Sequence, residues 1–405
     1  MGRTTAALLT FARLPKQTQY SKITHCVKAS IFIMRVLMLS KACLVGAYQT
    51  KLEAIARLPG VALTAIVPPS WDDPDGRVTL ERRYTEGYEL LVDPIRFNGR
   101  YHTYYFPRLP QRLAQLRPDI VHIDEEPYNL ATWLALRAAR AAGAKTLFFS
   151  WQNIARSYPL PFSLMERQVL AGVDYAIMGN QEAVGVWQSK GYAGPYQVIP
   201  QFGVDPDLFA PPPTRDPGRA FIIGSANRRL APEKGVDLLL RAAAELPGVW
   251  RLHVAGEGPA LPSLRRLADE LGIAARVHFD GPIPSTQVPA YLRELDALVL
   301  TSRTLPSWKE QFGRVLVEAM ACGVPVIGSR SGEIPHVIGD AGLTVPEEDI
   351  DALRNGLLQL MQDDALRREL SRRGRQRVLE RFTQAQIAAA TVDVYRRMLP
   401  RSEEK

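Results

Sequence analysis

The sequence predicts an α/β protein of two similar domains, each built on a parallel β-sheet with helices on both faces. Short apolar runs alternate with segments of helical periodicity from Met34 onward, which is the pattern of parallel sheets covered on both sides. A proline-rich stretch interrupts this alternation, and the same pattern begins again beyond it. The 405 residues are also enough for two domains that each bury a core.

The N-terminal domain is predicted to span 34–205. Its first unit is a strand over 35–40, followed by a polar loop and a helix over 48–58. A helix over 109–116 leads into a later strand of the same domain. The remaining strands are expected at 61–67, 119–123, 146–150 and 197–199.

A linker and a second domain follow. The chain between 200 and 219 carries six prolines, and we assign 206–219 to the linker and 220–383 to the C-terminal domain. The segment 384–399 has helical periodicity and no strand after it. It can pack on either domain, and one alternative is that it completes the N-terminal domain. The strands expected in the second domain are 220–223, 251–254, 276–279, 297–301 and 324–327.

The composition is that of a globular protein in a reducing compartment. Hydrophobic residues make up 46% and charged residues 23% of the chain. The apolar run 23–46 is broken by basic residues that would lie inside a bilayer, so we do not expect it to span a membrane. The three cysteines have neither an even count nor metal-ligand spacing, which argues against disulfides and a metal site and favours the cytoplasm. They are Cys26, Cys43 and Cys322.

Residues 1–33 lack a periodic pattern, and their apolar stretch is too short for a signal peptide. We interpret them as a flexible leader, with Met34 as an alternative start of translation. The net charge of +8 favours anionic substrates or an anionic surface without choosing between them. We expect no nucleic-acid partner.

The most informative segment places two glutamates, Glu310 and Glu318, eight positions apart, just past the expected strand 297–301. Ligands of open α/β sheets bind at the carboxyl ends of the strands. If a helix opens near Phe312, its free amide groups suit a diphosphate, and Glu318 lies about 9 to 12 Å further along the axis. Each carboxylate can then accept hydrogen bonds from one end of a nucleotide sugar. The alternative is that both are solvated helix charges.

The order of several motifs resembles glycosyltransferase family 4. The resemblance covers Met34 to Leu399 and implies the GT-B fold, in which two Rossmann-like domains face each other across a cleft. It also implies a retaining transferase that takes its sugar from a UDP- or GDP-linked donor. The segments that carry it are 310–318 with the following Ala-Met-Ala-Cys-Gly-Val-Pro-Val-Ile, Arg229-Leu-Ala-Pro-Glu-Lys234-Gly-Val-Asp, 254–259, 277–281 and 198–205.

The resemblance assigns Arg229 and Lys234 to a clamp for the diphosphate leaving group, and two cations after a strand suit that role. Taken alone, such a pair is more often two surface charges. The donor diphosphate would also meet the backbone beyond Glu310, Glu318 would hold ribose, and Glu310 would hold hydroxyls of the transferred sugar. The backbone positions expected to bind the donor there are Phe312, Gly313, Arg314 and Val315.

Two glycines are further candidates for donor contact. Gly46 follows the first strand, where a missing side chain lets the backbone approach the donor phosphates; a simple turn is the equal alternative. Gly256 begins a Gly-x-Gly that the resemblance places near the nucleobase. The full dinucleotide pattern is absent because Leu261 stands where a third glycine belongs, which disfavours an oxidoreductase.

The segment from His122 to Glu126 ends an expected strand where the family often carries His-x-His. His122 matches the first histidine, but Asp124 occupies the second position, so the histidine's role does not carry over. We expect Asp124, or alternatively Glu125, to face the donor, where it would orient the sugar, steady positive charge or accept a proton. We expect His122 itself to have a structural role, as a buried and hydrogen-bonded side chain.

A basic and aromatic stretch between Arg96 and Arg117 belongs to the domain expected to hold the acceptor. It could contact an anionic membrane at the inner face, although a solvated face over core aromatics is the commoner arrangement. The acceptor itself, whether glycan, lipid or small molecule, is not predicted beyond a role in polysaccharide or glycolipid synthesis. The basic and aromatic stretch consists of Arg96, Phe97, Arg100, Tyr101, Tyr104, Tyr105, Phe106, Arg108, Arg112 and Arg117.

No cofactor or metal is expected, because the sequence has no Asp-x-Asp pair and two cations can neutralise the leaving group. Two alternatives keep the same fold: a nucleotide-sugar epimerase, and a catalytically silent subunit that binds a partner.

Overall fold

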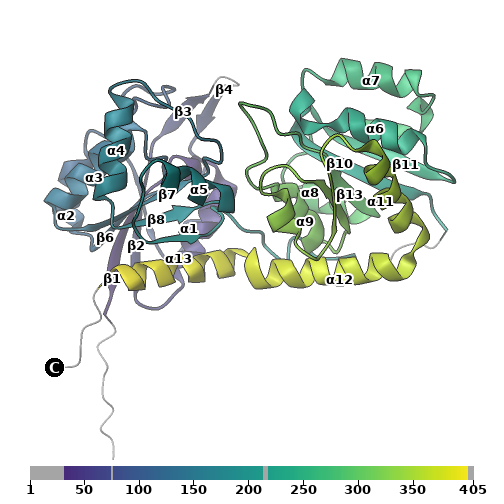
Figure 1. Ribbon diagram of the computed structural model, residues 1–405. Coiled ribbons are helices and arrows are strands. Elements are labelled where there is room, and N and C mark those ends of the chain that lie inside the picture. Colours follow the sequence, from purple (N-terminus) through teal and green to yellow (C-terminus); the bar gives the residue numbers. More distant parts are fainter. Residues whose placement is uncertain (1–31, 74–75, 213–217, 400–405) are drawn as a thin grey trace, which may run out of the picture. The chain divides into compact units, whose positions relative to one another are not determined.

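The computed structural model describes residues 32–73, 76–212 and 218–399, and it contains the two parallel sheets that the sequence predicts (Figure 1). The first sheet has seven strands in the order β5-β2-β1-β6-β7-β8-β9, and every neighbouring pair is parallel. Its strands are β1 (Met34–Leu39), β2 (Val61–Val67), β5 (Glu89–Val92), β6 (Ile120–Ile123), β7 (Lys145–Ser150), β8 (Tyr175–Met178) and β9 (Tyr196–Val198).

The second sheet has six parallel strands in the order β12-β11-β10-β13-β14-β15. A separate antiparallel pair, β3 (Ser70–Asp73) and β4 (Gly76–Thr79), follows β2. The strands of the second sheet are β10 (Phe221–Arg229), β11 (Trp250–Glu257), β12 (Val277–Gly281), β13 (Ala297–Leu300), β14 (Val326–Ser329) and β15 (Leu343–Val345).

Helices connect the strands of both sheets, as the alternating pattern requires. Those of the first half are α1 (Thr50–Ala56), α2 (Leu109–Leu116), α3 (Leu130–Ala141), α4 (Phe162–Gly172) and α5 (Gln181–Ser189). Those of the second half are α6 (Val236–Ala244), α7 (Leu261–Glu270), α8 (Val288–Glu294), α9 (Arg314–Ala321), α10 (Ile334–Ile338), α11 (Ile350–Gln362), α12 (Asp364–Arg381) and α13 (Gln384–Met398).

Each sheet separates two hydrophobic cores, because successive side chains of a strand point to opposite faces. In β1, Leu37 and Leu39 enter one core, whereas Val36 and Met38 enter the core on the other face. The central strands β6, β8, β13 and β14 are buried at every position, which explains why the sequence shows them as short continuous apolar runs.

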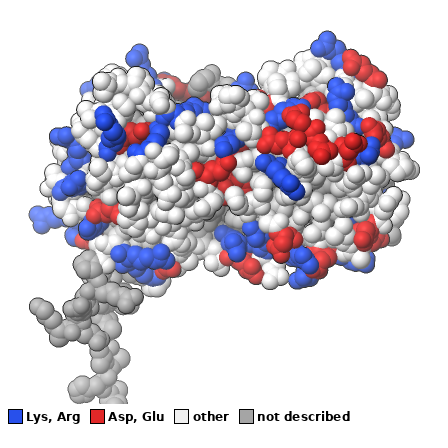
Figure 2. Space-filling model, in the orientation of Figure 1, with Lys and Arg blue, Asp and Glu red and all other residues white. Residues whose placement is uncertain are grey.

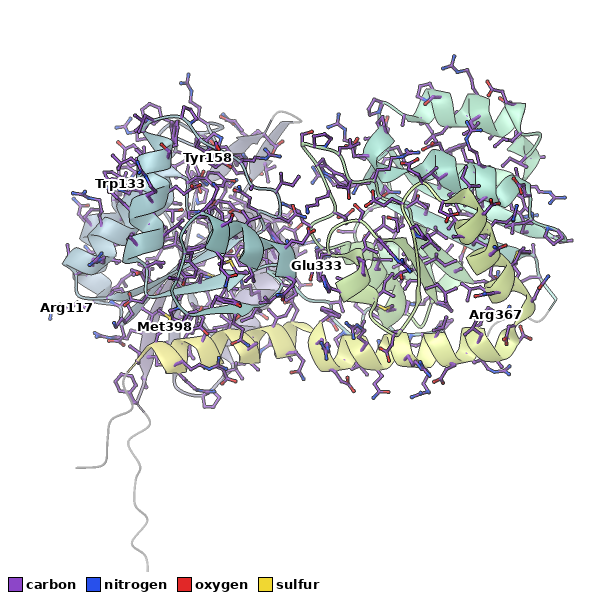
Figure 3. All side chains as sticks on the ribbon, viewed as in Figure 1. Arg117, Trp133, Tyr158, Glu333, Arg367 and Met398 are labelled. Carbon is purple, nitrogen blue, oxygen red and sulfur yellow. The ribbon has the colours of Figure 1, made fainter. Side chains whose placement is uncertain are left out.

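The last helix, α13, returns to the first sheet. Tyr395 and Met398, the latter labelled in Figure 3, belong to the core that also contains Met38 and Leu147. Helix α13 therefore completes the packing of the N-terminal sheet, which was one of the two alternatives. The chain therefore passes between the halves twice. The second passage is anchored where the Val204 N–H donates to the Phe382 carbonyl at 2.9 Å.

Some predicted elements begin or end elsewhere. The expected helix over 48–58 is regular only from Thr50, because a 3-10 turn, Gly46–Gln49, precedes it. Strand β10 extends to Arg229, well past the predicted 220–223, through a bulge that keeps its polar end paired with β11. The helix expected near Phe312 begins at Arg314.

Several composition-based expectations can be compared with the described ranges. No helix within them is long and apolar enough to cross a bilayer. Cys43 and Cys322 are buried free thiols. Cys26 and the predicted leader 1–33, except Phe32 and Ile33, lie outside the described residues, as does 213–217 of the predicted linker. On the face drawn in Figure 2, basic side chains form several separate groups among acidic ones.

Candidate active site

The loop before α9 brings Glu310 and Lys234 together. The Lys234 ammonium lies 2.8 Å from Glu310 Oε2, and the Ser302 hydroxyl donates to the same oxygen at 3.0 Å. Lys234 ends a 3-10 turn, Pro232–Lys234, and its ammonium lies 4.5 Å from the centre of the Trp308 ring. Lysine, serine and glutamate therefore form one cluster past the carboxyl ends of β10 and β13.

Gly235 fixes the position of Lys234. Its φ of 64° is one that other residues rarely adopt, and a Cβ here would lie 2.1 Å from the Thr301 carbonyl oxygen. The Thr301 hydroxyl in turn contacts the carbonyls of Lys234 and Gly235 at 3.1 and 2.9 Å. The turn that carries Lys234 is thus seated directly on the end of β13.

The N-terminus of α9 lies four residues beyond Glu310. Gly313 is its N-cap, and within the described ranges no side chain caps it or accepts a hydrogen bond from its first amide groups, those of Arg314 and Val315. These amides and the helix dipole favour an anion at this position. The ring of Phe312 packs against Trp151 and Phe382, at 5.6 and 5.8 Å between ring centres.

Glu318 lies on the second turn of α9 and does not contact Glu310. Its Oε1 accepts a hydrogen bond from Arg314 Nε at 2.8 Å. Burial raises the pKa of Glu318 above its usual value, and Arg314 acts against that shift. The guanidinium of Arg314 also lies over the Tyr48 ring at 5.6 Å, and Tyr48 stacks on Phe202 at 4.0 Å.

Arg229 and Gly256 are less closely tied to this cluster. Arg229 is exposed at the end of β10, and no hydrogen bond or ion pair joins it to Lys234 or Glu310 in the part of the chain that the structure describes. Gly256 has a φ of 123°, and a Cβ there would lie 1.9 Å from the Asn227 carbonyl oxygen. Close packing of β10 against β11 therefore requires glycine at this position, whatever the ligand.

In the first half, the end of β6 carries Asp124, which is fully buried and held from three sides. Ser40 Oγ donates to its Oδ2 at 2.6 Å, Gln201 Nε2 donates to the same oxygen at 3.0 Å, and the Lys51 ammonium lies 3.4 Å from Oδ1. Burial alone would raise the pKa of Asp124, but Lys51 and the two hydrogen bonds outweigh it and hold that pKa below its usual value. Asp124 is therefore an ionised carboxylate rather than a good base.

His122 is buried beneath Asp124 and is neutral. Its Nδ1 lies 2.7 Å from the Tyr395 hydroxyl of α13, whereas its Nε2 lies 4.0 Å from Asp124 Oδ1 and has no hydrogen-bond partner among the residues that the structure describes. Burial, reinforced by Lys51, lowers the pKa of His122 to about 3. His122 is thus buried as expected, but only one of its two ring nitrogens, Nδ1, makes the expected hydrogen bond.

Two further carboxyl groups follow directly. Glu125 Oε1 accepts the Lys41 N–H at 3.2 Å, and burial raises the pKa of Glu125. Glu126 accepts from the Ser150 hydroxyl at 2.5 Å and from the Trp151 N–H at 2.8 Å, and burial raises its pKa to about 7. Of the three successive acidic residues, Asp124 therefore has a lowered pKa, whereas Glu125 and Glu126 have raised ones.

These carboxyl groups border a cavity of about 220 Å³ that lies wholly within the first half of the chain. The loop after β1 forms one side of it, and aromatic residues form much of the rest. The residues that line it are Lys41, Ala42, Leu44, Val45, Tyr48, Trp71, Val78, Tyr101, Asp124, Glu125, Glu126, Phe149, Trp151 and Gln201.

Other side chains already occupy the space expected beside Gly46. Its N–H donates to Glu81 Oε2 at 3.0 Å, and a Cβ on Gly46 would lie 2.6 Å from Cδ of Arg83. A donor phosphate could use this amide only after the Glu81 carboxylate had moved. Only the exposed side chains of Glu81 and Arg83 would have to move to make room for a Cβ at Gly46, so this turn does not by itself require glycine.

The basic and aromatic stretch divides between core and surface. Tyr104 and Phe106 are buried in the hydrophobic core, and Arg112 pairs with Asp93 at 2.7 Å. Phe97 and Tyr101 are 56% and 50% exposed. Arg96, Arg100, Arg108 and Arg117 are exposed as well.

Several contacts join the Glu310 region to the first half of the chain. Asn153 Nδ2 donates to the Glu310 carbonyl at 3.1 Å, and the Gln181 N–H donates to Glu333 Oε2 at 3.1 Å. Glu333 is labelled in Figure 3. Among the described residues, no group of three or more histidine, cysteine, aspartate or glutamate side chains is arranged to hold a metal ion.

The motifs did not identify Lys51, Ser40, Ser302 and Gln201. Gln201 lies inside the 198–205 motif and Ser40 directly follows β1, so their positions carried a signal. Lys51 lies on α1 and reaches Asp124, 73 residues away, through the fold alone.

Comparison with known proteins agrees with this architecture. Residues 214–377 match the family model described as "Glycosyl transferases group 1". A GDP-mannose-dependent alpha-(1-6)-phosphatidylinositol monomannoside mannosyltransferase of Mycolicibacterium smegmatis is 37% identical over 176 residues, which are 40% of this chain and 46% of that protein. The chain spans less than half of the length of the curated relatives it matches.

Two solved structures resemble nearly all of the chain. Sucrose-phosphate synthase from Thermosynechococcus elongatus superposes with a TM-score of 0.66 at 22% identity, covering 90% of this chain and 99% of that one. Anabaena HepE in complex with UDP gives a TM-score of 0.66 at 16% identity, covering 90% and 100%. The fold is therefore GT-B, with two Rossmann-like parallel-sheet domains.

Proposed function

We propose that the protein is a retaining glycosyltransferase of family 4 that moves a sugar from a nucleotide-diphosphate donor to an acceptor. The observation that supports this most is the cluster of Lys234, Glu310 and Ser302 beside the uncapped end of α9. It lies within the segment that matches the group 1 glycosyltransferases. A cation and free helix amides suit a diphosphate, and a carboxylate beside them suits sugar hydroxyls.

The donor diphosphate would lie at Lys234 and the amides of Phe312 to Val315, with Arg229 swinging in from the end of β10. Preorganised charges of this kind stabilise the negative charge that develops on the leaving diphosphate. Glu318 would bind the ribose hydroxyls and Gly256 would lie near the base. HepE was solved with UDP, and the mycobacterial relative is described as GDP-mannose-dependent, so both bases belong in the test.

Transfer would retain the anomeric configuration. The acceptor oxygen would attack the anomeric carbon on the face from which the diphosphate leaves, the bond from that carbon to the phosphate oxygen would break, and the acceptor proton would pass to that oxygen. Glu310 would hold the hydroxyls of the transferred sugar. Asp124, an ionised carboxylate with a lowered pKa, would steady positive charge at the anomeric carbon rather than accept a proton.

We propose that the reaction needs no metal, because Lys234 and Arg229 can neutralise the leaving group. Undiminished activity in a chelating buffer is expected. Restoration of a chelated enzyme by magnesium or manganese would contradict this part of the proposal.

We further propose a cytoplasmic protein that touches the inner face of a membrane. Phe97 and Tyr101, which are half-exposed, lie on the same loop as the exposed Arg96 and Arg100. Aromatic side chains and cations together favour an anionic lipid surface. Binding to anionic but not to neutral vesicles is the expected result, and binding to neither would contradict it.

Titration with UDP and GDP, followed by incubation with UDP- and GDP-sugars, tests the main proposal. Lys234→Ala should weaken binding of the diphosphate at least tenfold, whereas Lys145→Ala, at an exposed lysine paired with Asp174, should not. Unchanged affinity in Lys234→Ala would overturn the site. Turnover of the donor without an acceptor to an isomer would instead indicate an epimerase, and binding without turnover would indicate a silent subunit.

A further inference from the structure

The cavity of the first domain has a size and a lining that indicate what it binds. Its volume is about 220 Å³, and every lining residue lies between Lys41 and Gln201. Sites for drug-sized ligands usually measure about 300 to 1,000 Å³. The cavity therefore accommodates one small ring rather than an extended chain.

Aromatic rings form one wall of the cavity. Trp71 is buried, Tyr101 is 50% exposed, and the two rings meet edge to face at 5.6 Å between their centres. The Lys41 ammonium lies 3.6 Å from the centre of the Tyr101 ring and 4.3 Å from that of Trp71. The one cation among the lining residues is thus held against this wall by cation–π contacts.

Carboxyl groups form the other polar part of the lining. Asp124, Glu125 and Glu126 all line the cavity. Asp124 is paired with Lys51, so Glu125 and Glu126 are the two acidic residues that stand against the single lining cation, Lys41. Carboxylate oxygens accept hydrogen bonds, and a protonated carboxyl can also donate one, which matches hydroxyl groups in both roles. An anionic ligand beside these carboxyl groups would meet like charge, which disfavours its binding strongly.

We propose that this cavity binds the acceptor as an uncharged sugar or polyol ring, with its C–H face against the Tyr101 and Trp71 rings and its hydroxyls toward Glu125 and Glu126. The assignment of this ring as the acceptor rests on the proposed glycosyltransferase function. A phosphate on this ring would lie beside the Glu125 and Glu126 carboxyl groups, so we expect a phosphorylated ring to bind more weakly than a neutral one.

A direct binding measurement separates this inference from the proposed function. Calorimetric titration of the full chain with neutral methyl glycosides and cyclic polyols should show binding. The corresponding hexose phosphates and inositol phosphates should bind at least tenfold more weakly. Tyr101→Ala should weaken binding of the neutral ring at least fivefold without changing the affinity for UDP or GDP. Tyr196→Ala, at a tyrosine that is 40% exposed on β9 outside the cavity, is the matched control.

The charge of the lining provides a second, independent readout. Glu126→Gln keeps the shape of the side chain and removes its charge, so the ratio of affinities for phosphorylated and neutral rings should rise at least threefold. A purely structural role for Glu126 would lower both affinities together and leave this ratio unchanged.

Each outcome decides one of the two proposals. Tighter binding of phosphorylated rings, an unchanged affinity in Tyr101→Ala or an unchanged ratio in Glu126→Gln would overturn the cavity assignment, even if donor binding and transfer were intact. Binding of neutral rings that depends on Tyr101, combined with no affinity for nucleoside diphosphates, would support the cavity and overturn the transferase function instead.

Discussion

At the level of single residues, the buried pair of Lys51 and Asp124 is the contact on which the first domain's polar centre depends. The side chains are 3% and 0% exposed, so neither charge can be solvated if its partner is removed. Ser40 and Gln201 satisfy one oxygen of Asp124, and Lys51 provides the charge. Removal of one partner of such a pair is strongly destabilising.

We therefore predict that Lys51→Met lowers the free energy of unfolding by about 3 to 5 kcal/mol, because it leaves Asp124 buried without a counterion. Lys145→Met removes an exposed lysine from its pair with Asp174, and it should cost about 1 kcal/mol or less. Urea unfolding at pH 7 measures both variants. Equal losses of unfolding free energy in the two variants would show that the buried Lys51–Asp124 pair matters no more for stability than the exposed pair.

His122 predicts a defined acid sensitivity. Its folded pKa of about 3 lies below the ordinary 6.5, so unfolding takes up a proton between these two values. The stability that the neutral ring contributes is complete above pH 6.5 and is lost progressively as the pH falls toward 3. Lys51, Asp124 and Tyr395 are the groups that face the ring.

Between pH 6 and pH 5, the wild type should accordingly lose about 1 kcal/mol more than His122→Gln, which has no proton to take up there. Chemical unfolding of both proteins at each pH measures this difference. Parallel pH dependences in the two proteins would mean that His122 is protonated in the folded state.

The sequence predicts the residues of the candidate site better than their partners. Glu310 and Lys234 belong to motifs whose order is informative, and the fold does bring them within hydrogen-bond distance. Lys51 could not be predicted, because a lysine on an amphipathic helix looks like a surface charge until tertiary packing places Asp124 beside it. The contact of Glu81 with Gly46 could not be predicted either, because the fold brings these two segments together.

At the level of elements, the short turn between β10 and α6 positions the candidate phosphate-binding lysine. Gly235 and Gly272 have nearly the same backbone φ, 64° and 68°, but their surroundings differ. A Cβ at Gly235 would lie 2.1 Å from the Thr301 carbonyl oxygen, whereas a Cβ at Gly272 would meet nothing within 4 Å. This pair separates the cost of the φ angle from the cost of a steric clash.

Gly272→Ala should lower the free energy of unfolding by about 1 to 2 kcal/mol, which is the cost of a left-handed conformation alone. Gly235→Ala should lose more, because the turn must also move away from β13, and it should weaken nucleoside diphosphate binding by displacing Lys234. Thermal unfolding and a titration with UDP and GDP test both effects. Equal stability losses and equal affinities would show that the turn does not position Lys234.

Element boundaries follow the sequence most closely where the spacing of apolar residues is regular along the whole element. Strand β2 and helix α2 have the predicted bounds and α13 ends one residue before the predicted 399, because their apolar spacing fits one period from end to end. The prediction for β10 ended at Ile223, since the residues beyond it are small or polar. Pairing with β11, and not hydrophobicity, keeps them in the sheet up to Arg229.

At the level of the whole molecule, the first sheet depends on a helix from the far end of the chain. Val392 on α13 is fully buried in the core that includes Met38 and Leu147. Val392→Asp places an unpaired charge there, and we expect a loss of more than about 4 kcal/mol or no folded protein at all. Ala385→Asp, at an exposed position of the same helix, should change the stability by about 0.5 kcal/mol or less.

Soluble yield, circular dichroism and unfolding curves compare these two α13 variants. A Val392→Asp protein as stable as Ala385→Asp would mean that α13 is not needed by the first sheet. The periodicity of 384–399 predicted this helix but could not choose the sheet on which it packs, because an apolar face fits any apolar surface of matching shape.

This arrangement has a consequence for how the protein is made. During translation, the strands of the first sheet leave the ribosome long before α13 does. The nascent N-terminal domain must therefore wait with part of one apolar face, the part that α1 does not cover, exposed until almost all of the second domain has been synthesised. The interval is one in which a chaperone that shields apolar surface would be most useful. A ribosome stalled between the two domains would hold a chain whose first sheet cannot yet close its own core.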